Sequence, residues 1–87
     1  MPMPPVINVG FYNYVVASQI VALVSSDSAP VRRLIQGLRN SERLIDATQG
    51  RRTKCVIFTQ SQQVILSAIS QETLAKRLAS GEVVEEE

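Results

Sequence analysis

The chain has 87 residues, of which 45% are hydrophobic, with one cysteine, no histidine and no tryptophan. This length suits one domain near the lower limit for a self-sufficient core, and the apolar fraction excludes a mainly disordered chain. The single cysteine, Cys55, excludes an intrachain disulfide, and its apolar neighbours predict a small buried side chain. No run approaches the roughly 20 apolar residues of a membrane span and no secretion signal is visible, so we expect a cytoplasmic protein without a membrane partner.

The charge of the chain is unevenly distributed, although the net charge is only +1. Four of the eight acidic residues lie in the last six positions: Glu82, Glu85, Glu86 and Glu87. The remaining body holds nine basic and four acidic residues, and seven of the basic ones fall between Arg32 and Lys54. A concentrated basic stretch predicts an anionic partner, for which the acidic tail could compete weakly.

The first third of the chain favours short strands. Residues 1–5 contain three prolines and are expected to be flexible. Residues 6–9 and 14–16 are predicted strands around a turn near Gly10, and the β signal resumes over residues 19–25. The pattern leaves open whether the last two segments form one bent strand or two.

A helix is predicted over residues 29–40. Ser28 is a good N-cap, Pro30 suits the first turn, and Asn40 is a plausible C-terminal stop. Four aliphatic residues then recur at helical spacing: Val31, Leu34, Ile35 and Leu38. Polar residues occupy the opposite side: Arg32, Arg33, Gln36 and Arg39.

The second half of the chain predicts three more strands and a helix. The strands span residues 44–47, 53–59 and 64–69, and the helix spans residues 71–79 between the N-cap Ser70 and the terminating Gly81. We therefore expect an α+β domain over residues 6–80, followed by a disordered acidic tail at 81–87. Its sheet should be small and mostly antiparallel, with five or six short strands and two short helices.

Two predicted strands carry consecutive apolar residues, at 55–58 and 64–66. A sheet with one wet face would alternate instead, so these strands should be buried on both faces. Two short helices can cover only part of such a sheet. We therefore expect a second subunit to cover the remainder, which makes the protein a homo-oligomer.

The segment from Leu44 to Lys54 is the most informative for function. Gln49-Gly50 predicts a tight turn, since Gly50 can adopt φ > 0 without steric cost. Arg51, Arg52 and Lys54 follow at once and suit a polyanion backbone, although a merely solvated charged turn is equally compatible. Asp46 lies across the turn, where a salt bridge that orients an arginine is a better prediction than acid–base catalysis.

Catalytic and metal-binding patterns are missing from the sequence. Without histidine, the usual general base and metal ligand near neutral pH are absent. No glycine-rich phosphate motif occurs, and the carboxylates of the body are not obviously paired. We therefore expect a binding module without catalytic residues, metal, cofactor or small-molecule substrate.

Five blocks of the sequence together resemble the RemA family of small bacterial regulators. The blocks are Asn8-Val9-Gly10-Phe11, Ser28-Ala29-Pro30, Leu44-Ile45-Asp46-Ala47-Thr48, Gly50-Arg51-Arg52-Thr53 and Val64-Ile65-Leu66-Ser67. No single block would suffice, but their order and spacing over roughly residues 6–78 are specific.

The resemblance implies a DNA-binding transcriptional regulator of biofilm-matrix genes, associated with the nucleoid in the cytoplasm. Family members form rings, so roughly seven or eight subunits are expected to present basic residues to double-stranded DNA. The family's DNA-contacting arginine pair corresponds to Arg51 and Arg52. A further family arginine, in a context like Ser-Ala-Asn-Arg, corresponds to Gln19, which implies weaker or more salt-sensitive DNA binding.

The full candidate DNA-binding set is Arg51, Arg52, Lys54, Gln19, Arg32 and Arg33. A structural or assembly protein, in which the arginines build subunit contacts, is the main alternative. RNA binding is less favoured because few aromatic residues are available to stack unpaired bases.

Overall fold

The computed structural model describes residues 5–81 as a small α+β domain with two helices and six strands in two sheets. Except for Pro5 and Gly81, the predicted flexible N-terminus and acidic tail lie outside the described residues. The elements are β1 (Val6–Asn8), β2 (Tyr14–Val16), a 3₁₀ turn (Ala17–Gln19), β3 (Ile20–Ser25), α1 (Ala29–Gly37), β4 (Leu44–Asp46), β5 (Cys55–Thr59), β6 (Val64–Ser67) and α2 (Gln71–Ser80). Strand ends differ from the prediction by one or two residues, and neither described helix is long and apolar enough to cross a membrane.

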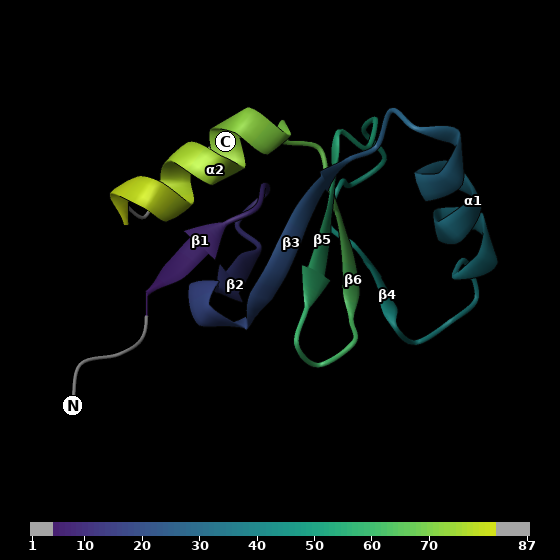
Figure 1. Ribbon diagram of the computed structural model, residues 1–87, viewed down its shortest axis with the longest axis horizontal. Helices are drawn as coiled ribbons and strands as arrows, with labels where there is room; N and C mark the ends of the chain where they lie inside the picture. The colour runs from purple at the N-terminus through teal and green to yellow at the C-terminus, as the bar shows by residue number, and fades with distance from the viewer. Residues whose placement is uncertain (1–4, 82–87) are drawn as a thin grey trace.

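The strands form two separate sheets, so the prediction of one sheet is wrong. β1 and β2 pair as an antiparallel ribbon, and the other strands form a four-stranded sheet in the order β3-β5-β6-β4 (Figure 1). Within the larger sheet β4 and β6 run parallel, whereas the other pairs are antiparallel. The 3₁₀ turn at Ala17–Gln19 answers the open question of one strand or two, because it separates β2 from β3 and sends them into different sheets.

Both faces of the four-stranded sheet are covered by the chain itself (Figure 1). On one face, Ile35 of α1 packs with Val56, Val64 and Leu66. On the other face, residues of β5 and β6 form a core with residues of β1 and α2: Ile7, Val9, Ala47, Cys55, Ile57, Ile65 and Leu74. Burial on both faces is confirmed, but the premise that these strands need a second subunit is wrong, because the β1–β2 ribbon folds over the sheet.

The helix ends show how local sequence sets the boundaries. The Ser28 Oγ accepts a hydrogen bond from Val31 N (3.3 Å), which confirms the predicted cap, but α1 ends at Gly37 rather than at residue 40. Glycine is a poor helix former, and Leu38 N already donates to Ile35 O (3.1 Å) in a tightened last turn. For α2, the predicted Ser70 cap and the left-handed Gly81 (φ 71°) are both confirmed.

Candidate nucleic-acid interface

The loop between β4 and β5, residues 47–54, lies at one end of the four-stranded sheet. β6 lies between these two strands, so the loop passes the end of β6 on its way to β5. The predicted tight turn is present: Gln49 (φ 51°) and Gly50 (φ 84°) both have positive φ, and Arg51 N donates to Thr48 O (3.0 Å). The two strands that it connects are not neighbours, because β4 pairs with β6.

Hydrogen bonds tie the loop down on both sides of this turn. Before the turn, the backbone N and the hydroxyl of Thr48 both donate to Asp46 Oδ1, at 2.9 and 2.6 Å. After it, Ser26 Oγ donates to Thr53 O (2.7 Å) and Lys54 N donates to Ser67 O (2.8 Å). The cations of the loop therefore project from a fixed backbone.

Asp46 does not orient an arginine of the turn, so that prediction is wrong. Its two hydrogen bonds from Thr48 lower the pKa of the carboxyl below its usual value, and the charge of Arg39 lowers it further. Arg52 pairs instead with Asp27, at 3.9 Å, and both side chains are about four-fifths exposed. An ion pair this exposed contributes little to stability and leaves Arg52 available to another anion.

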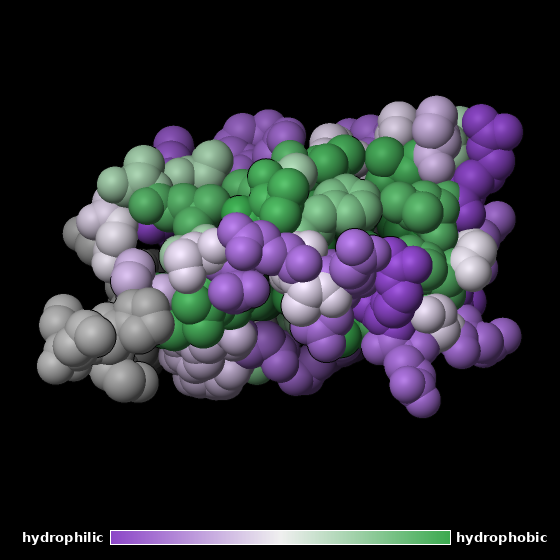
Figure 2. Space-filling view, turned by 60° about the horizontal axis from the view of Figure 1, so that its bottom comes forward, coloured by the Kyte–Doolittle hydropathy of each residue, from purple (hydrophilic) through white to green (hydrophobic). Residues whose placement is uncertain are grey.

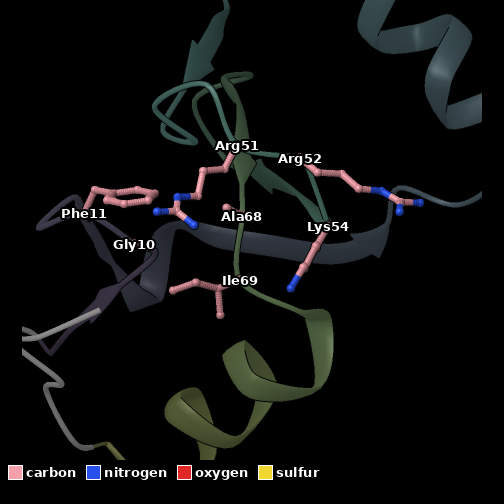
Figure 3. A pocket seen from close by; sticks show the side chains of 7 residues that line it. All are labelled: Gly10, Phe11, Arg51, Arg52, Lys54, Ala68 and Ile69. Atoms are coloured by element: carbon pink, nitrogen blue, oxygen red, sulfur yellow. The ribbon is translucent and has the colours of Figure 1, made fainter.

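Three adjoining hollows bring the cations of this end together. The largest, about 560 Å³, is lined by Gly10, Phe11, Arg51, Arg52, Lys54, Ala68 and Ile69 (Figure 3). A second, near the start of α2, is lined by Ser25, Asp27, Arg52, Thr53, Lys54, Ser70, Gln71 and Glu72. A third, beside α1, is lined by Ser26, Asp27, Arg32, Ile35, Gln36, Arg39, Arg52 and Thr53. Arg52 lines all three, so the hollows form one cationic surface with Arg52 at its centre.

We call this surface the cationic end and define it by five side chains: Arg32, Arg39, Arg51, Arg52 and Lys54. Four of them belong to the predicted set, and Arg39 was missed. Its signal was present in the sequence, since Arg32, Gln36 and Arg39 follow one another at i, i+4 and i+7 on one helical face. Within residues 5–81, only the carboxylates of Asp27 and Glu72 line the same hollows, so the described part of this surface carries a net positive charge.

Phe11 was also missed, because nothing in its local sequence indicates that its ring would contact an arginine 40 positions later. Its ring lies beneath the guanidinium of Arg51, with 5.7 Å between the Arg51 Cζ atom and the ring centroid. Figure 3 shows the Arg51 side chain extending toward this ring, whereas Arg52 extends away from it.

Two predicted residues lie elsewhere. Arg33 is exposed on α1 and lines none of these three hollows. Gln19 precedes β3, whose other end leads to the cationic end, so the six residues of that strand separate the two by about 20 Å. There its carbonyl accepts a hydrogen bond from Gln60 N (2.8 Å).

The described residues offer little for catalysis or metal binding. Within residues 5–81, no group of three or more His, Cys, Asp or Glu side chains could hold a metal ion. Cys55 is buried, as predicted, and this burial raises the pKa of its thiol to about 11. The thiol is therefore neutral near pH 7, which makes it a poor nucleophile.

Comparison with known proteins gives the family of the chain. Residues 6–78 match the RemA-like family, described as extracellular matrix regulatory protein A-like. A protein of Heliobacterium modesticaldum is 58% identical over 78 residues (90% of this chain and 86% of that protein), and one of Clostridium botulinum is 54% identical over 81 residues (93% and 91%). A protein of Clostridium perfringens is 55% identical over 78 residues (90% and 88%), and all three bear a provisional description as regulatory proteins. The chain therefore belongs to the RemA-like family of regulatory proteins.

Proposed function

We propose that this protein is a DNA-binding transcriptional regulator, not an enzyme, and that its cationic end contacts the phosphate backbone of double-stranded DNA. Membership of the RemA-like family and the regulatory descriptions of its relatives support a regulatory role. By the same resemblance, its targets are biofilm-matrix genes, and it acts on the nucleoid in the cytoplasm.

The cationic end is the observation that carries this proposal. Arginine and lysine side chains are exposed there on a backbone that is tied at both sides of its turn. Guanidinium groups held in this way can each engage a phosphate through two parallel hydrogen bonds. Because the support is fixed, little conformational entropy is lost when the arginines meet DNA.

We further propose that the chain works as a homo-oligomeric ring. A monomer offers five cations at this surface, and repeating them around a ring adds many weak contacts to one DNA molecule. Figure 2 shows hydrophobic residues gathered in a band along one face of the molecule. Val21 of β3 is 64% exposed and Ile45 of β4 is 40% exposed, and both strands are edges of the sheet. Apolar side chains on open edges support association with further copies.

In this proposal Gln19 takes part only through assembly. Within one chain it lies a strand length away from Arg51 and Arg52, so one copy cannot place all three side chains on the same phosphate. A neighbouring copy could bring its own Gln19 beside the cationic end. The contribution of Gln19 to DNA binding therefore requires the assembly, whereas the assembly does not require Gln19.

The test is the salt dependence of DNA binding, measured by fluorescence anisotropy on a labelled duplex with light scattering in parallel. Backbone binding predicts that log K falls linearly with log salt, by about 0.9 for each phosphate neutralised. A protein that shows no binding at 50 mM salt contradicts the DNA-binding proposal. If that protein is nevertheless a stable oligomer, the alternative of an assembly protein, with arginines at subunit contacts, replaces it.

A further inference from the structure

The loop between β1 and β2 has an unusual backbone. Three successive residues, Gly10, Phe11 and Tyr12, have positive φ values of 116°, 52° and 61°. Glycine adopts such values freely, but bulky side chains rarely do, and the conformation persists only where the surroundings enforce it. The Phe11 backbone is therefore held in place by its neighbours.

Hydrogen bonds within the β1–β2 loop hold its backbone in this conformation. Asn13 closes the loop by donating to Gly10 O from its backbone N (3.0 Å) and from its side-chain Nδ2 (2.8 Å). Val9 N donates to Asn13 O (2.8 Å), and Gly10 N donates to the buried Asn8 Oδ1 (2.8 Å). The loop is thus fixed at its base, and it presents Phe11 to the cationic end.

The contact with Phe11 leaves the hydrogen-bonding edge of Arg51 unused. A guanidinium lying over an aromatic ring is attracted to the ring face, which does not consume its N–H donors. Within residues 5–81, no hydrogen bond or ion pair is formed by the Arg51 guanidinium. Arg52 differs, because it has the carboxylate of Asp27 at 3.9 Å and, among the described residues, no aromatic ring against its guanidinium.

We propose that Phe11 is a positioning residue that holds the Arg51 guanidinium flat, with its donor edge toward the DNA backbone. This inference rests on the proposed function and deepens it. The strained loop fixes the ring, the ring fixes the guanidinium, and the planar group then meets a phosphate with fewer side-chain conformations left to lose. Tyr12, beside it, is 65% exposed and has no such contact with a cation within the described chain.

The experiment compares Phe11→Leu with Tyr12→Leu, which changes the neighbouring residue at a similar backbone φ. In the absence of DNA, NMR should show the ring-current shift of the Arg51 side-chain protons lost in Phe11→Leu and retained in Tyr12→Leu. DNA affinity should fall about two- to five-fold in Phe11→Leu. Phe11→Tyr, which keeps the ring, should restore it, and Tyr12→Leu should bind like the wild type.

A double-mutant cycle separates positioning from a structural role. In an Arg51→Ala background, Phe11→Leu should have no further effect on affinity, because the group it positions is gone. Equal weakening by Phe11→Leu in both backgrounds would overturn the inference, and so would wild-type affinity of Phe11→Leu. If the unmodified protein binds no DNA at all, both the proposed function and this inference are rejected. If the unmodified protein binds DNA but substitution of Phe11 leaves the affinity unchanged, only the inference is rejected.

Discussion

The two ends of the four-stranded sheet are built by the same strands but differ in charge. One is the cationic end. The other, which we call the amide end, consists of the 3₁₀ turn and the β5–β6 turn, with the amides Gln19, Gln60, Gln62 and Gln63. Arg43, which precedes β4 at this end, donates from its Nε to Gln62 O (2.9 Å). Only the cationic end can release many counterions from DNA.

The two ends also differ in how they are assembled. The β5–β6 turn is local, closed by Thr59 N donating to Gln63 O (3.1 Å). The cationic end combines four connections with one helix. The connections are the β1–β2 loop, the β3–α1 connection, the β4–β5 loop and the β6–α2 connection, and α1 with the residues that follow it adds Arg32 and Arg39. A concentrated charge is thus produced by topology, since the parallel pairing of β4 with β6 carries the arginines to this end. If DNA binding follows the same division, substitutions at the cationic end should weaken it and matched substitutions at the amide end should not.

The largest effect is expected from removing the arginine pair. Arg51→Ala with Arg52→Ala should abolish DNA binding, which means at least a hundred-fold loss of affinity, and flatten the salt dependence. Arg43→Ala removes a charge at the amide end and should leave affinity within about two-fold of the wild type. The measurements are anisotropy titrations at several salt concentrations, with light scattering to follow assembly. A double mutant that dissociates into monomers would identify these arginines as assembly residues instead.

The second prediction compares buried hydroxyls at the two ends. Ser67 is fully buried, and its Oγ donates to Val9 O (2.7 Å) and accepts from Ile69 N (3.1 Å). Ser67→Ala leaves a buried carbonyl without its donor and should cost about 1–3 kcal/mol of unfolding free energy. Thr59→Val removes a hydroxyl that bonds Gln63 at the amide end and should cost a similar amount.

The two variants should differ in DNA binding. Ser67 lies beside Lys54, whose backbone N donates to Ser67 O, so its loss should loosen the cationic end and weaken binding several-fold. Thr59→Val should bind normally in the folded state. Urea unfolding gives the stability of each variant, and titration at low urea gives its affinity. Equal losses of affinity in both would show that the ends are not independent.

The third prediction places a charge at the amide end. Gln19→Arg should tighten DNA binding a few-fold at low salt and steepen the salt slope by about 0.9, because a neighbouring copy would carry the new arginine to the DNA. Gln60→Arg, on the adjacent turn, is the matched control for added charge. If the salt slope of Gln19→Arg equals that of the wild type, Gln19 does not contribute to the DNA site. If Gln19→Arg and Gln60→Arg gain equal affinity, the gain reflects the added net charge and not the position of residue 19.

The features that depend on neighbouring residues could be predicted from the sequence. The caps at Ser28 and Ser70, the turn at Gln49-Gly50 and the doubly buried strands all rest on neighbouring residues, and the structure confirms them. The division into two sheets depends on which strands pair across long separations, which no local pattern records. For the same reason the arginine pair could be predicted but its contact with Phe11, which belongs to a distant segment, could not. Arg39 differs, because its helical spacing from Arg32 was a local signal, but only the fold shows that both lie beside Arg52.

The smallest effect is a dependence of stability on pH that involves Asp46. Its carboxylate accepts two hydrogen bonds from Thr48, and these hold its pKa below the ordinary value of 3.8. A carboxyl with a lowered folded-state pKa contributes stability that is fully present above its unfolded-state pKa, near 4. That contribution is lost as the pH falls from about 4 through the folded-state pKa, because protonation weakens both acceptor bonds.

Asp46→Asn is the matched variant for this prediction, since its amide oxygen can still accept from Thr48 but does not titrate. At pH 7 the wild type should be slightly more stable than Asp46→Asn, and the difference should shrink as the pH falls from about 4 toward pH 3. Thermal unfolding followed by circular dichroism between pH 3 and pH 7 measures it. Because Asp46 is exposed, the effect should be modest, and DNA affinity at pH 7 should change far less than in the Arg51→Ala/Arg52→Ala double mutant. A difference between the two proteins that is constant with pH would assign the role of Asp46 to packing, not to its charge.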